Sequence, residues 1–427
     1  MNEPKATSGV PEAVRAGVPT VWRNPLVRPA DDTLSELPQR FYDLAAAGRL
    51  WRWFAPLLSR LFPELKASGG FIDSALVEPK DSFARTVLGA EGRVLVKADH
   101  DLPVTGSIKA RGGVFEVLWY ADRVARSFGL PPEGRAALAN RVWKERFSQH
   151  TIVVGSTGNL GYSVGVMARA LGFAAEVHMS SDAKAWKKDR LRHIGVNVIE
   201  HAADYTAAVA AARSSAATRP QCHFVDDESS EHLFYGYAKA ASHLSRQLEA
   251  AGIAVDADRP LQVYLPCGVG GAPAGITFGL KHIFADAVHC VLVEPVESPC
   301  MLVQLASGSE ESVSVYDIGR TNRTIQDGLA VASASLFAAG VVRNLIDGVV
   351  TVSDATSLEW VRRAWFEAGL KLEPSAASAL AAPAVWTRSG GDPQHCTHVV
   401  WTTGGGLLPD DVFRQLLNDS PADATRS

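Results

Sequence analysis

The stretch Thr151-Ile-Val-Val-Gly-Ser-Thr-Gly-Asn-Leu-Gly161 decides the fold class, because it combines a short apolar strand, a glycine-rich turn and the start of a helix. After the turn, apolar residues recur at helical spacing, at Leu160, Val164, Met167 and Leu171. Five further short apolar runs resemble this strand: 93–97, 176–179, 262–265, 288–293 and 397–401. Strand, turn and helix in alternation predict an α/β fold with mostly parallel sheets flanked by helices. Ligands of such sheets bind beyond the carboxyl ends of the strands, so the turns there are candidate sites.

Length and composition narrow the class of protein. A chain of 427 residues is longer than one core usually serves, so two or more domains are expected. The net charge of -4 predicts no nucleic-acid partner, and no apolar run approaches the roughly 20 residues that span a bilayer. The five cysteines are odd in number and widely spread, which argues against a disulfide framework or a zinc site. We expect a cytoplasmic protein of enzyme size.

The first candidate turn is Thr105-Gly-Ser-Ile-Lys-Ala-Arg-Gly-Gly113, which follows a predicted strand and precedes a helix. Its lysine, Lys109, stands between Ile108 and Ala110, and these apolar neighbours favour burial. A lysine that forms an imine must be partly neutral, which burial favours. Taken alone, Lys109 is better explained as one surface charge among 42 basic residues.

The second turn is Gly155–Gly161. Glycines at a strand-to-helix turn leave backbone N–H groups free, and a helix N-terminus attracts an anion. A substrate carboxylate suits that position, with the hydroxyls of Ser156 and Thr157 as further donors, and Asn159 could bind a ring hydroxyl. An ordinary glycine-rich turn is the alternative.

The third turn, Pro266-Cys-Gly-Val-Gly-Gly-Ala-Pro273, offers successive N–H groups for a phosphate. A dinucleotide fingerprint is the alternative, since Gly268 and Gly270 fit its first two glycines and Glu294 could bind a ribose. However, Pro273 stands where that fingerprint has a small third residue, and the other turns are then unexplained.

The fourth turn is Trp401-Thr-Thr-Gly-Gly-Gly406, and the order of all four resembles the fold type II (tryptophan-synthase-β-like) enzymes that use pyridoxal 5'-phosphate (PLP). Within that group the chain most closely resembles the bacterial D-serine dehydratase (D-serine ammonia-lyase) family. Matching stretches run along nearly the whole chain: 103–113, 154–161, 185–188, 264–271, 294–295, 298–302, 326–331 and 372–376. Two stretches depart from the family, Gly270-Gly-Ala-Pro-Ala274, which should keep its phosphate-binding N–H donors, and Ala332-Ser-Ala-Ser335, which bears on substrate specificity.

The resemblance implies a PLP-dependent ammonia-lyase that converts D-serine to pyruvate and ammonia by α,β-elimination, and D-threonine more slowly to 2-oxobutyrate. Lys109 would hold PLP as a Schiff base, Asn159 would face its ring oxygen and Thr403 its ring nitrogen. The phosphate would be bound by Gly268, Val269, Gly270, Gly271 and Ala272. Thr157 would be catalytic, and Ser156, Thr157 and Asn159 would bind the substrate.

Two acids each have two possible assignments. Asp226 matches a family position that engages the substrate amine or hydroxyl, although a solvated loop acid is an equal alternative. Glu294 could ligate a monovalent cation such as K+, or serve as a helix-capping or structural acid. Other functions stay open at this point: an L-serine/threonine dehydratase or serine racemase on the same fold, a protein that retains PLP without turnover, and a nucleotide-dependent oxidoreductase.

The resemblance also implies two domains. Residues 1–85 are expected to form a helical extension packed on the large PLP-binding domain, made of 86–125 and 235–427. Residues 126–234 are expected to form a small mobile domain, whose closure on a small amino-acid substrate would exclude water. Neither nucleic acid nor a membrane is expected as a partner. Both a monomer, the state of close relatives, and a dimer, common in the wider superfamily, stay open.

Overall fold

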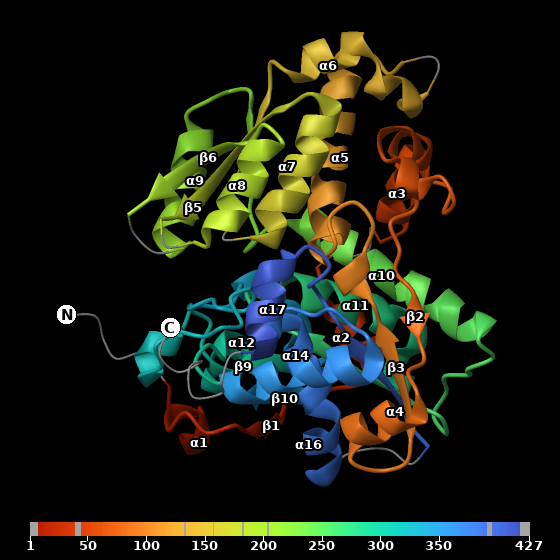
Figure 1. The fold of residues 1–427 in the computed structure, drawn as a ribbon, viewed down its shortest axis with the longest axis vertical. Coiled ribbons are helices and arrows are strands. Elements are labelled where there is room, and N and C mark those ends of the chain that lie inside the picture. Colours follow the sequence, from red (N-terminus) through yellow and green to blue (C-terminus); the bar gives the residue numbers. More distant parts are fainter. Residues whose placement is uncertain are drawn as a thin grey trace. The chain divides into compact units, whose positions relative to one another are not determined.

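The computed structural model describes residues 7–38, 44–131, 134–156, 158–181, 183–202, 205–390 and 395–418 (Figure 1). The chain divides into two compact units, each with its own sheet. Unit 1 comprises Met1–Phe41, Ser74–Asp101 and Ala240–Ser427, and unit 2 comprises Tyr42–Asp73 and Leu102–Lys239. The predicted α/β fold of mostly parallel sheets flanked by helices is confirmed.

Unit 1 contains a seven-stranded sheet in the order β1-β10-β9-β8-β11-β3-β2. Its inner strands run parallel to one another: β10 (Gly348–Val352), β9 (Val288–Pro295), β8 (Leu261–Pro266), β11 (Thr397–Trp401) and β3 (Arg93–Lys97). The edge strands β1 (Val21–Arg23) and β2 (Leu76–Val77) pair antiparallel to them. Every residue of β8 and β10 is buried, as expected where helices cover both faces of a parallel sheet.

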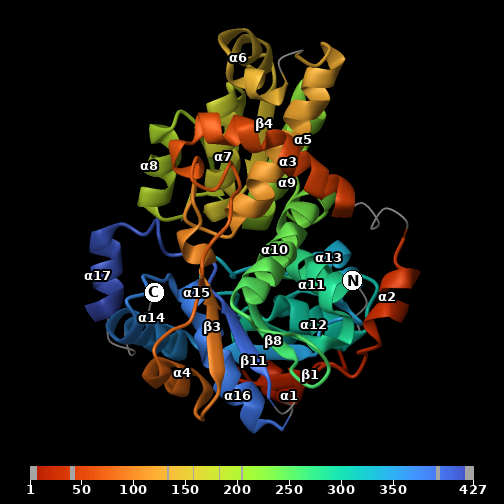
Figure 2. The same cartoon turned by 90° about the vertical axis from the view of Figure 1, so that its right-hand side faces the viewer.

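Two groups of helices pack on this sheet. The first contains α2 (Ala30–Glu36), α11 (Gly271–Phe284), α12 (Cys300–Ser307) and α13 (Leu336–Val342). The second contains α4 (Asp81–Leu88), α14 (Asp354–Ala368), α15 (Pro374–Ala377), α16 (Ala382–Arg388) and α17 (Asp410–Asn418). Figure 2 shows these groups on opposite sides of β3 and β11. The short helix α1 (Glu12–Arg15) precedes β1.

The N-terminal 85 residues do not form the purely helical extension that the sequence suggested. Residues Val21–Arg23 form the edge strand β1, and Val21 pairs with Val350 of β10. The added strand satisfies backbone groups that an edge would otherwise leave unpaired. Helix α3 (Leu44–Leu61) lies in unit 2 instead, where it contacts α5 (Lys109–Ser127). The two units of the structure therefore begin and end at other residues than the expected domains.

Unit 2 contains a four-stranded parallel sheet in the order β6-β5-β4-β7. Its strands are β4 (Thr151–Gly155), β5 (Ala174–Ser180), β6 (Asn197–His201) and β7 (Cys222–Val225). Besides α3 and α5, its helices are α6 (Arg141–Phe147), α7 (Asn159–Leu171), α8 (Ala185–His193), α9 (Tyr205–Ala217) and the first part of α10 (Glu231–Ala250). Helix α5 packs against α7, and α9 packs on β4 and β5. The strand, turn and helix predicted over 151–171 are confirmed as β4 and α7.

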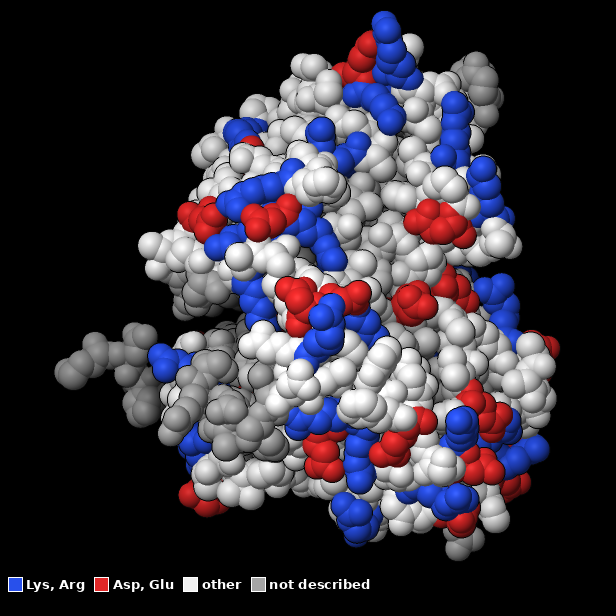
Figure 3. All heavy atoms as spheres, in the orientation of Figure 1, with Lys and Arg blue, Asp and Glu red and all other residues white. Residues whose placement is uncertain are grey.

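The charges on the surface and the hydropathy of the helices are relevant to the expected absence of nucleic-acid and membrane partners. Positive and negative side chains are interspersed on the face drawn in Figure 3, and the net charge is -4. Throughout the described ranges, none of the helices is both long enough and apolar enough to cross a membrane. The five cysteines are free thiols.

Candidate active site

Lys109 is the first residue of α5 in unit 2. The turn before it is tied to α7 by a hydrogen bond of 2.9 Å between the hydroxyls of Thr105 and Ser163. The helix that follows is closely packed, since a Cβ at Gly112 would lie 2.4 Å from the ring of Tyr237. Glycine at this position therefore lets α5 approach Tyr237. The expected burial of Lys109 is partial, because 20% of its side chain remains exposed.

The Lys109 ammonium forms an ion pair with Asp227, whose Oδ2 lies 3.7 Å from Nζ. The other oxygen of this carboxylate, Oδ1, is buried and has no hydrogen-bond partner within the described ranges. Tyr237 is fully buried, with its ring centroid 5.7 Å from Nζ. Burial, followed by the charges of Asp227 and Glu116, raises the pKa of this phenol well above its usual value. The Tyr237 phenol therefore remains protonated and neutral beside the lysine.

Asp226 has a different environment from Asp227. Its carboxylate accepts hydrogen bonds from Arg213 Nη2 at 3.1 Å and from the backbone N–H of Glu228 at 3.1 Å. The acid beside Lys109 is thus the second of the run Asp226-Asp227-Glu228, and the sequence analysis named the first. The role suggested for Asp226 stays a prediction. The acidic run was visible in the sequence, but nothing local distinguished its two aspartates.

The second predicted turn lies between β4 and α7. The Ser156 hydroxyl oxygen accepts hydrogen bonds from the backbone N–H groups of Gly158, at 3.2 Å, and Gly161, at 3.0 Å. Its O–H remains the group that could donate to a ligand. Asn159 is the first residue of α7, where helix N–H groups have no acceptor within the helix. Thr157 lies outside the described residues.

A basic residue that received no role from the sequence also lies at this turn. A Cβ built at Gly158 would be 3.0 Å from the Nζ atom of Lys187, the third residue of α8. The ammonium group therefore adds positive charge beside the first turn of α7. An anion would be stabilised there by both the helix N-terminus and the lysine.

The predicted phosphate loop of unit 1 connects β8 to α11. Gly270 precedes the helix with a φ of 108°, a conformation that favours glycine, and a Cβ there would lie 2.3 Å from Met301 Cε. A Cβ at Gly268 would lie 3.2 Å from the carbonyl oxygen of Gly328. The loop is anchored by the Ser335 N–H, which donates to Val269 O at 2.8 Å. Close packing and unpaired N–H groups at the helix start suit a phosphate.

The terminal turn of unit 1 distinguishes its two threonines. The Thr402 hydroxyl is hydrogen-bonded to His100 Nδ1 at 2.7 Å and donates to Lys97 O at 3.1 Å. Thr403 is 8% exposed, and its hydroxyl makes no hydrogen bond to any described residue. Burial lowers the pKa of His100, which favours the neutral imidazole. Thr402 is therefore structural, and Thr403 is the hydroxyl available to a ligand.

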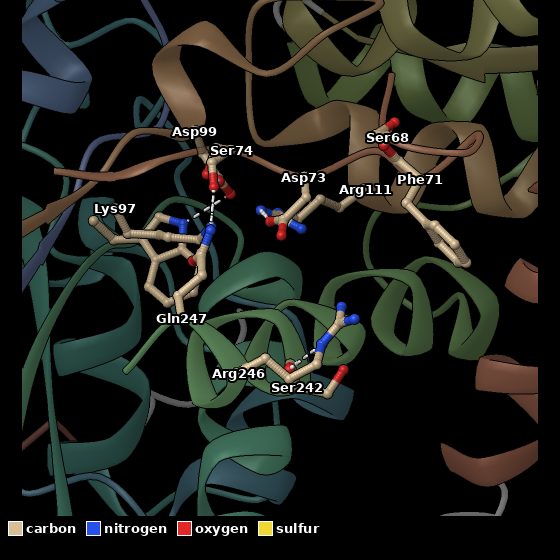
Figure 4. Close-up of polar contacts among 11 residues, drawn as sticks. Ser68, Phe71, Asp73, Ser74, Lys97, Asp99, Arg111, Ser242, Arg246 and Gln247 are labelled. Atoms are coloured by element: carbon tan, nitrogen blue, oxygen red, sulfur yellow. Dashed lines mark hydrogen bonds and ion pairs between the residues drawn. The ribbon is translucent and has the colours of Figure 1, made fainter. Parts of the chain in front are cut away.

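A buried polar network supports this turn from β3 (Figure 4). Lys97 Nζ donates to Ser74 O at 2.6 Å and to Gln247 Oε1 at 2.8 Å. Ser74 Oγ donates to Asp99 Oδ1 at 2.6 Å, and Trp401 Nε1 donates to Asp99 Oδ2 at 2.8 Å. The network ties the end of β3 to the start of the Thr403 turn. Its members gave no signal in the sequence, because they lie far apart in the chain.

Glu294 is the penultimate residue of β9 and is fully buried. Its Oε1 accepts from the Met301 N–H at 2.7 Å and its Oε2 from the Leu302 N–H at 2.9 Å, so the carboxyl group caps α12. Burial raises its pKa to about 8, against the opposing effect of these two hydrogen bonds. Among the described residues, no group of three or more His, Cys, Asp or Glu side chains could hold a metal ion. A cation at Glu294 stays a prediction.

The donor groups of each unit, taken by itself, fit the chemistry of PLP. Unit 2 supplies a partly buried amine, Lys109, beside a carboxylate with an unpartnered buried oxygen. Unit 1 supplies a glycine loop at a helix start, closely packed at Gly268 and Gly270, and the Thr403 hydroxyl. An amine, a phosphate cradle and a neutral partner for a ring nitrogen are the groups that bind this cofactor.

Comparisons with known proteins agree with this chemistry. The profile of the family described as "Pyridoxal-phosphate dependent enzyme" matches residues 82–404. A Rhizobium etli protein named "Probable D-serine dehydratase" is 50% identical over 97% of this chain and 96% of its own length. A Sinorhizobium medicae protein of the same name is 51% identical over 96% of each chain. The fold resembles that of diaminopropionate ammonia lyase from Escherichia coli in complex with D-serine, with a TM-score of 0.72, 18% identity and coverage of 94% and 97%. The chain therefore belongs to the family of pyridoxal-phosphate dependent enzymes.

Proposed function

We propose that this chain is a D-serine ammonia-lyase that converts D-serine to pyruvate and ammonia, and D-threonine more slowly to 2-oxobutyrate. The observation that carries the proposal is the similarity, at about half of all positions and along nearly the whole length, to relatives named for D-serine dehydration. The residues that suit PLP lie within the part of the chain that is similar to these relatives. L-serine or L-threonine dehydration, racemisation and nucleotide-dependent oxidation are not favoured.

PLP, when bound, supplies an electron sink for the charge that develops at the substrate Cα. The amine that would hold it is Lys109 Nζ, which would also be the group that moves a proton at the substrate. Asp227 lies within ion-pair distance of that nitrogen and can orient it. The N–H groups of residues 268–272 hold the phosphate, and Thr403 donates or accepts a hydrogen bond at the ring nitrogen.

The substrate carboxylate is assigned to the turn formed by Ser156, Thr157 and Asn159. The Ser156 O–H, the positive end of the α7 dipole and the nearby Lys187 ammonium are suited to bind an anion. Thr157 and Asp226 are proposed to serve the face of the substrate opposite Lys109. Closure of the domain that carries this turn would exclude water during proton transfer.

Three further assignments concern the compartment, the cation and the assembly. We propose a cytoplasmic enzyme, because the five cysteines are free thiols, as is usual in a reducing compartment. A monovalent cation near Glu294 would have to bind lone pairs that the two backbone N–H groups leave free. A monomer is the proposed assembly, by resemblance to close relatives.

The deciding assay measures ammonia release from D-serine, L-serine, D-threonine and L-threonine with the PLP-loaded protein. We expect the fastest turnover with D-serine, slower turnover with D-threonine and little with either L substrate. Faster turnover of an L substrate would overturn the D-selectivity and leave the PLP chemistry standing. A protein that binds no PLP would overturn the proposal as a whole.

A further inference from the structure

A buried carboxylate lies on the same helix as Lys109, two turns further along. Glu116 of α5 is 2% exposed. Its Oε1 accepts a hydrogen bond from His223 Nε2 at 2.8 Å, and its Oε2 accepts one from Ser230 Oγ. A carboxylate removed from water needs such donors for both of its oxygens. Glu116 has no role in the function proposed above.

The two partners of Glu116 bracket the segment that carries Asp227. His223 lies in β7, immediately before that segment, and Ser230 lies at its end. Ser230 also caps α10, because its hydroxyl accepts from the Leu233 N–H at 3.1 Å. The backbone N–H of Ser230 donates to Asp226 O at 2.9 Å, which closes the segment into a turn. One carboxylate thus holds both ends of this turn.

The orientation of His223 is set by its aromatic neighbours. Its ring stacks on Tyr120, with centroids 4.4 Å apart and planes inclined by 11°, and lies 5.8 Å from the ring of Trp119. Tyr120 is itself hydrogen-bonded to His150 at 2.9 Å. Because the imidazole is packed between these groups, its Nε2 points to Glu116 along a defined direction. Because the His223 side chain is itself held in place, its hydrogen bond to Glu116 also fixes the backbone at the end of β7.

We infer that Glu116 is a positioning residue: through His223 and Ser230 it fixes the 226–230 turn, and so holds the Asp227 carboxylate beside Lys109. The inference rests on the proposed function only in giving Lys109 the role of the PLP-holding amine. Without the hydrogen bond from Ser230 to Glu116, the turn can move, and the Asp227 carboxylate then lies further from the Lys109 ammonium. Lys109 Nζ then loses its ion-pair partner, and an amine that is not held in an ion pair is more open to an external acylating reagent.

The test measures the reactivity of Lys109 in the full-length protein freed of PLP. Acetic anhydride labels neutral amines, and the labelling of Lys109 is quantified by mass spectrometry against the exposed Lys144 of unit 2. In Glu116→Gln the amide oxygen still accepts from His223, but Ser230 loses the charged oxygen to which it donates, and the amide N–H2 group can offer it only a weaker bond between neutral groups. We expect Lys109 to label about threefold to tenfold faster in this variant than in the wild type.

Three further proteins make the measurement specific. Glu176→Gln is the matched control, because Glu176 is also a partly buried acid of unit 2 but is paired with Arg219. It should leave the labelling of Lys109 unchanged. Asp227→Asn should accelerate labelling at least as much as Glu116→Gln, and adding Glu116→Gln to Asp227→Asn should have no further effect. An additive double variant, or wild-type labelling of Glu116→Gln, would overturn the inference.

If the Glu116→Gln protein does not fold, substitutions at Ser230 provide a second test. Ser230→Ala removes only one of the two bonds and should accelerate labelling in the same direction, whereas Ser230→Thr keeps the hydroxyl and should restore the wild-type rate. Wild-type labelling of Ser230→Ala would then count against the inference. None of these readouts needs PLP or D-serine turnover. Failure of the lyase assay would therefore leave this result intact, and failure here would leave the lyase assignment intact.

Discussion

At the scale of single residues, the two threonines of the terminal turn give a sharp prediction. Thr403→Ala should reduce both PLP affinity and activity, because a ring-nitrogen hydrogen bond of about 0.5–1.5 kcal/mol is lost. The affinity is measured by titrating the PLP-free protein and following the near-visible absorption. Thr402→Ala removes a hydroxyl that binds His100 and Lys97, so it should mainly lower the free energy of unfolding. A Thr402→Ala protein that binds PLP worse than Thr403→Ala would show that the assignment is displaced by one residue.

Residue-level prediction from the sequence was possible where a local pattern marked a candidate turn. The lysine turn, the phosphate loop and the terminal threonine could each be proposed because glycines mark a turn after a strand. The choice between Asp226 and Asp227 could not be made in this way. Only the pairing of Asp226 with Arg213 and the approach of Asp227 to Lys109 separate them, and both contacts depend on packing between distant segments.

At the scale of an element, the buried cap of α12 makes stability depend on pH. The pKa of Glu294 is about 8 in the folded protein, against an ordinary value of 4.5. Its contribution to stability is therefore complete below about pH 4.5 and is lost as the pH rises toward 8, since the unfolded chain ionises first. The loss approaches about 1.4 kcal/mol for each pH unit across that interval. Urea unfolding of the wild type at a series of pH values measures it.

The Glu294→Gln variant tests the cause of this dependence. An amide cannot ionise, so the contribution of residue 294 between pH 4.5 and 8 should disappear. Glu176→Gln is the control, because Arg219 lowers the pKa of Glu176 and its contribution is lost on acidification instead. If the Glu294→Gln protein keeps the full wild-type slope, another group causes the dependence. If both variants flatten the slope equally, the effect is not specific to α12.

The strands show why some elements were predictable and others were not. The runs 93–97 and 397–401 coincide with β3 and β11, because a buried strand of a parallel sheet is a continuous apolar run. Strand β1 contains only Val21, Trp22 and Arg23 and has no periodicity to detect. It is a strand because β10 offers an unpaired edge. Its structure therefore depends on a partner more than 300 residues away.

At the scale of the whole molecule, PLP should stabilise the folded chain. A ligand that binds only the native state adds about 2.7 kcal/mol at a free concentration one hundred times its Kd. If Lys109 holds PLP as proposed, the wild type bonds covalently to the cofactor, whereas Lys109→Ala would rely on the proposed contacts of the phosphate loop and the Thr403 turn. We expect PLP to raise the Tm of both proteins, with the variant needing a higher PLP concentration for the same increase. The variant should show no lyase activity.

Thermal unfolding across a PLP titration, followed by fluorescence or calorimetry, measures this difference. Reduction of the wild-type complex with borohydride should attach the cofactor to the peptide that contains Lys109, and a label on another lysine would contradict the assignment of the amine. Equal stabilisation of both proteins at every concentration would mean that Lys109 adds nothing to binding. If PLP stabilised neither protein, the proposed binding of PLP would be wrong. The expected ordering follows because the covalent bond adds to noncovalent contacts that unit 1 retains in the variant.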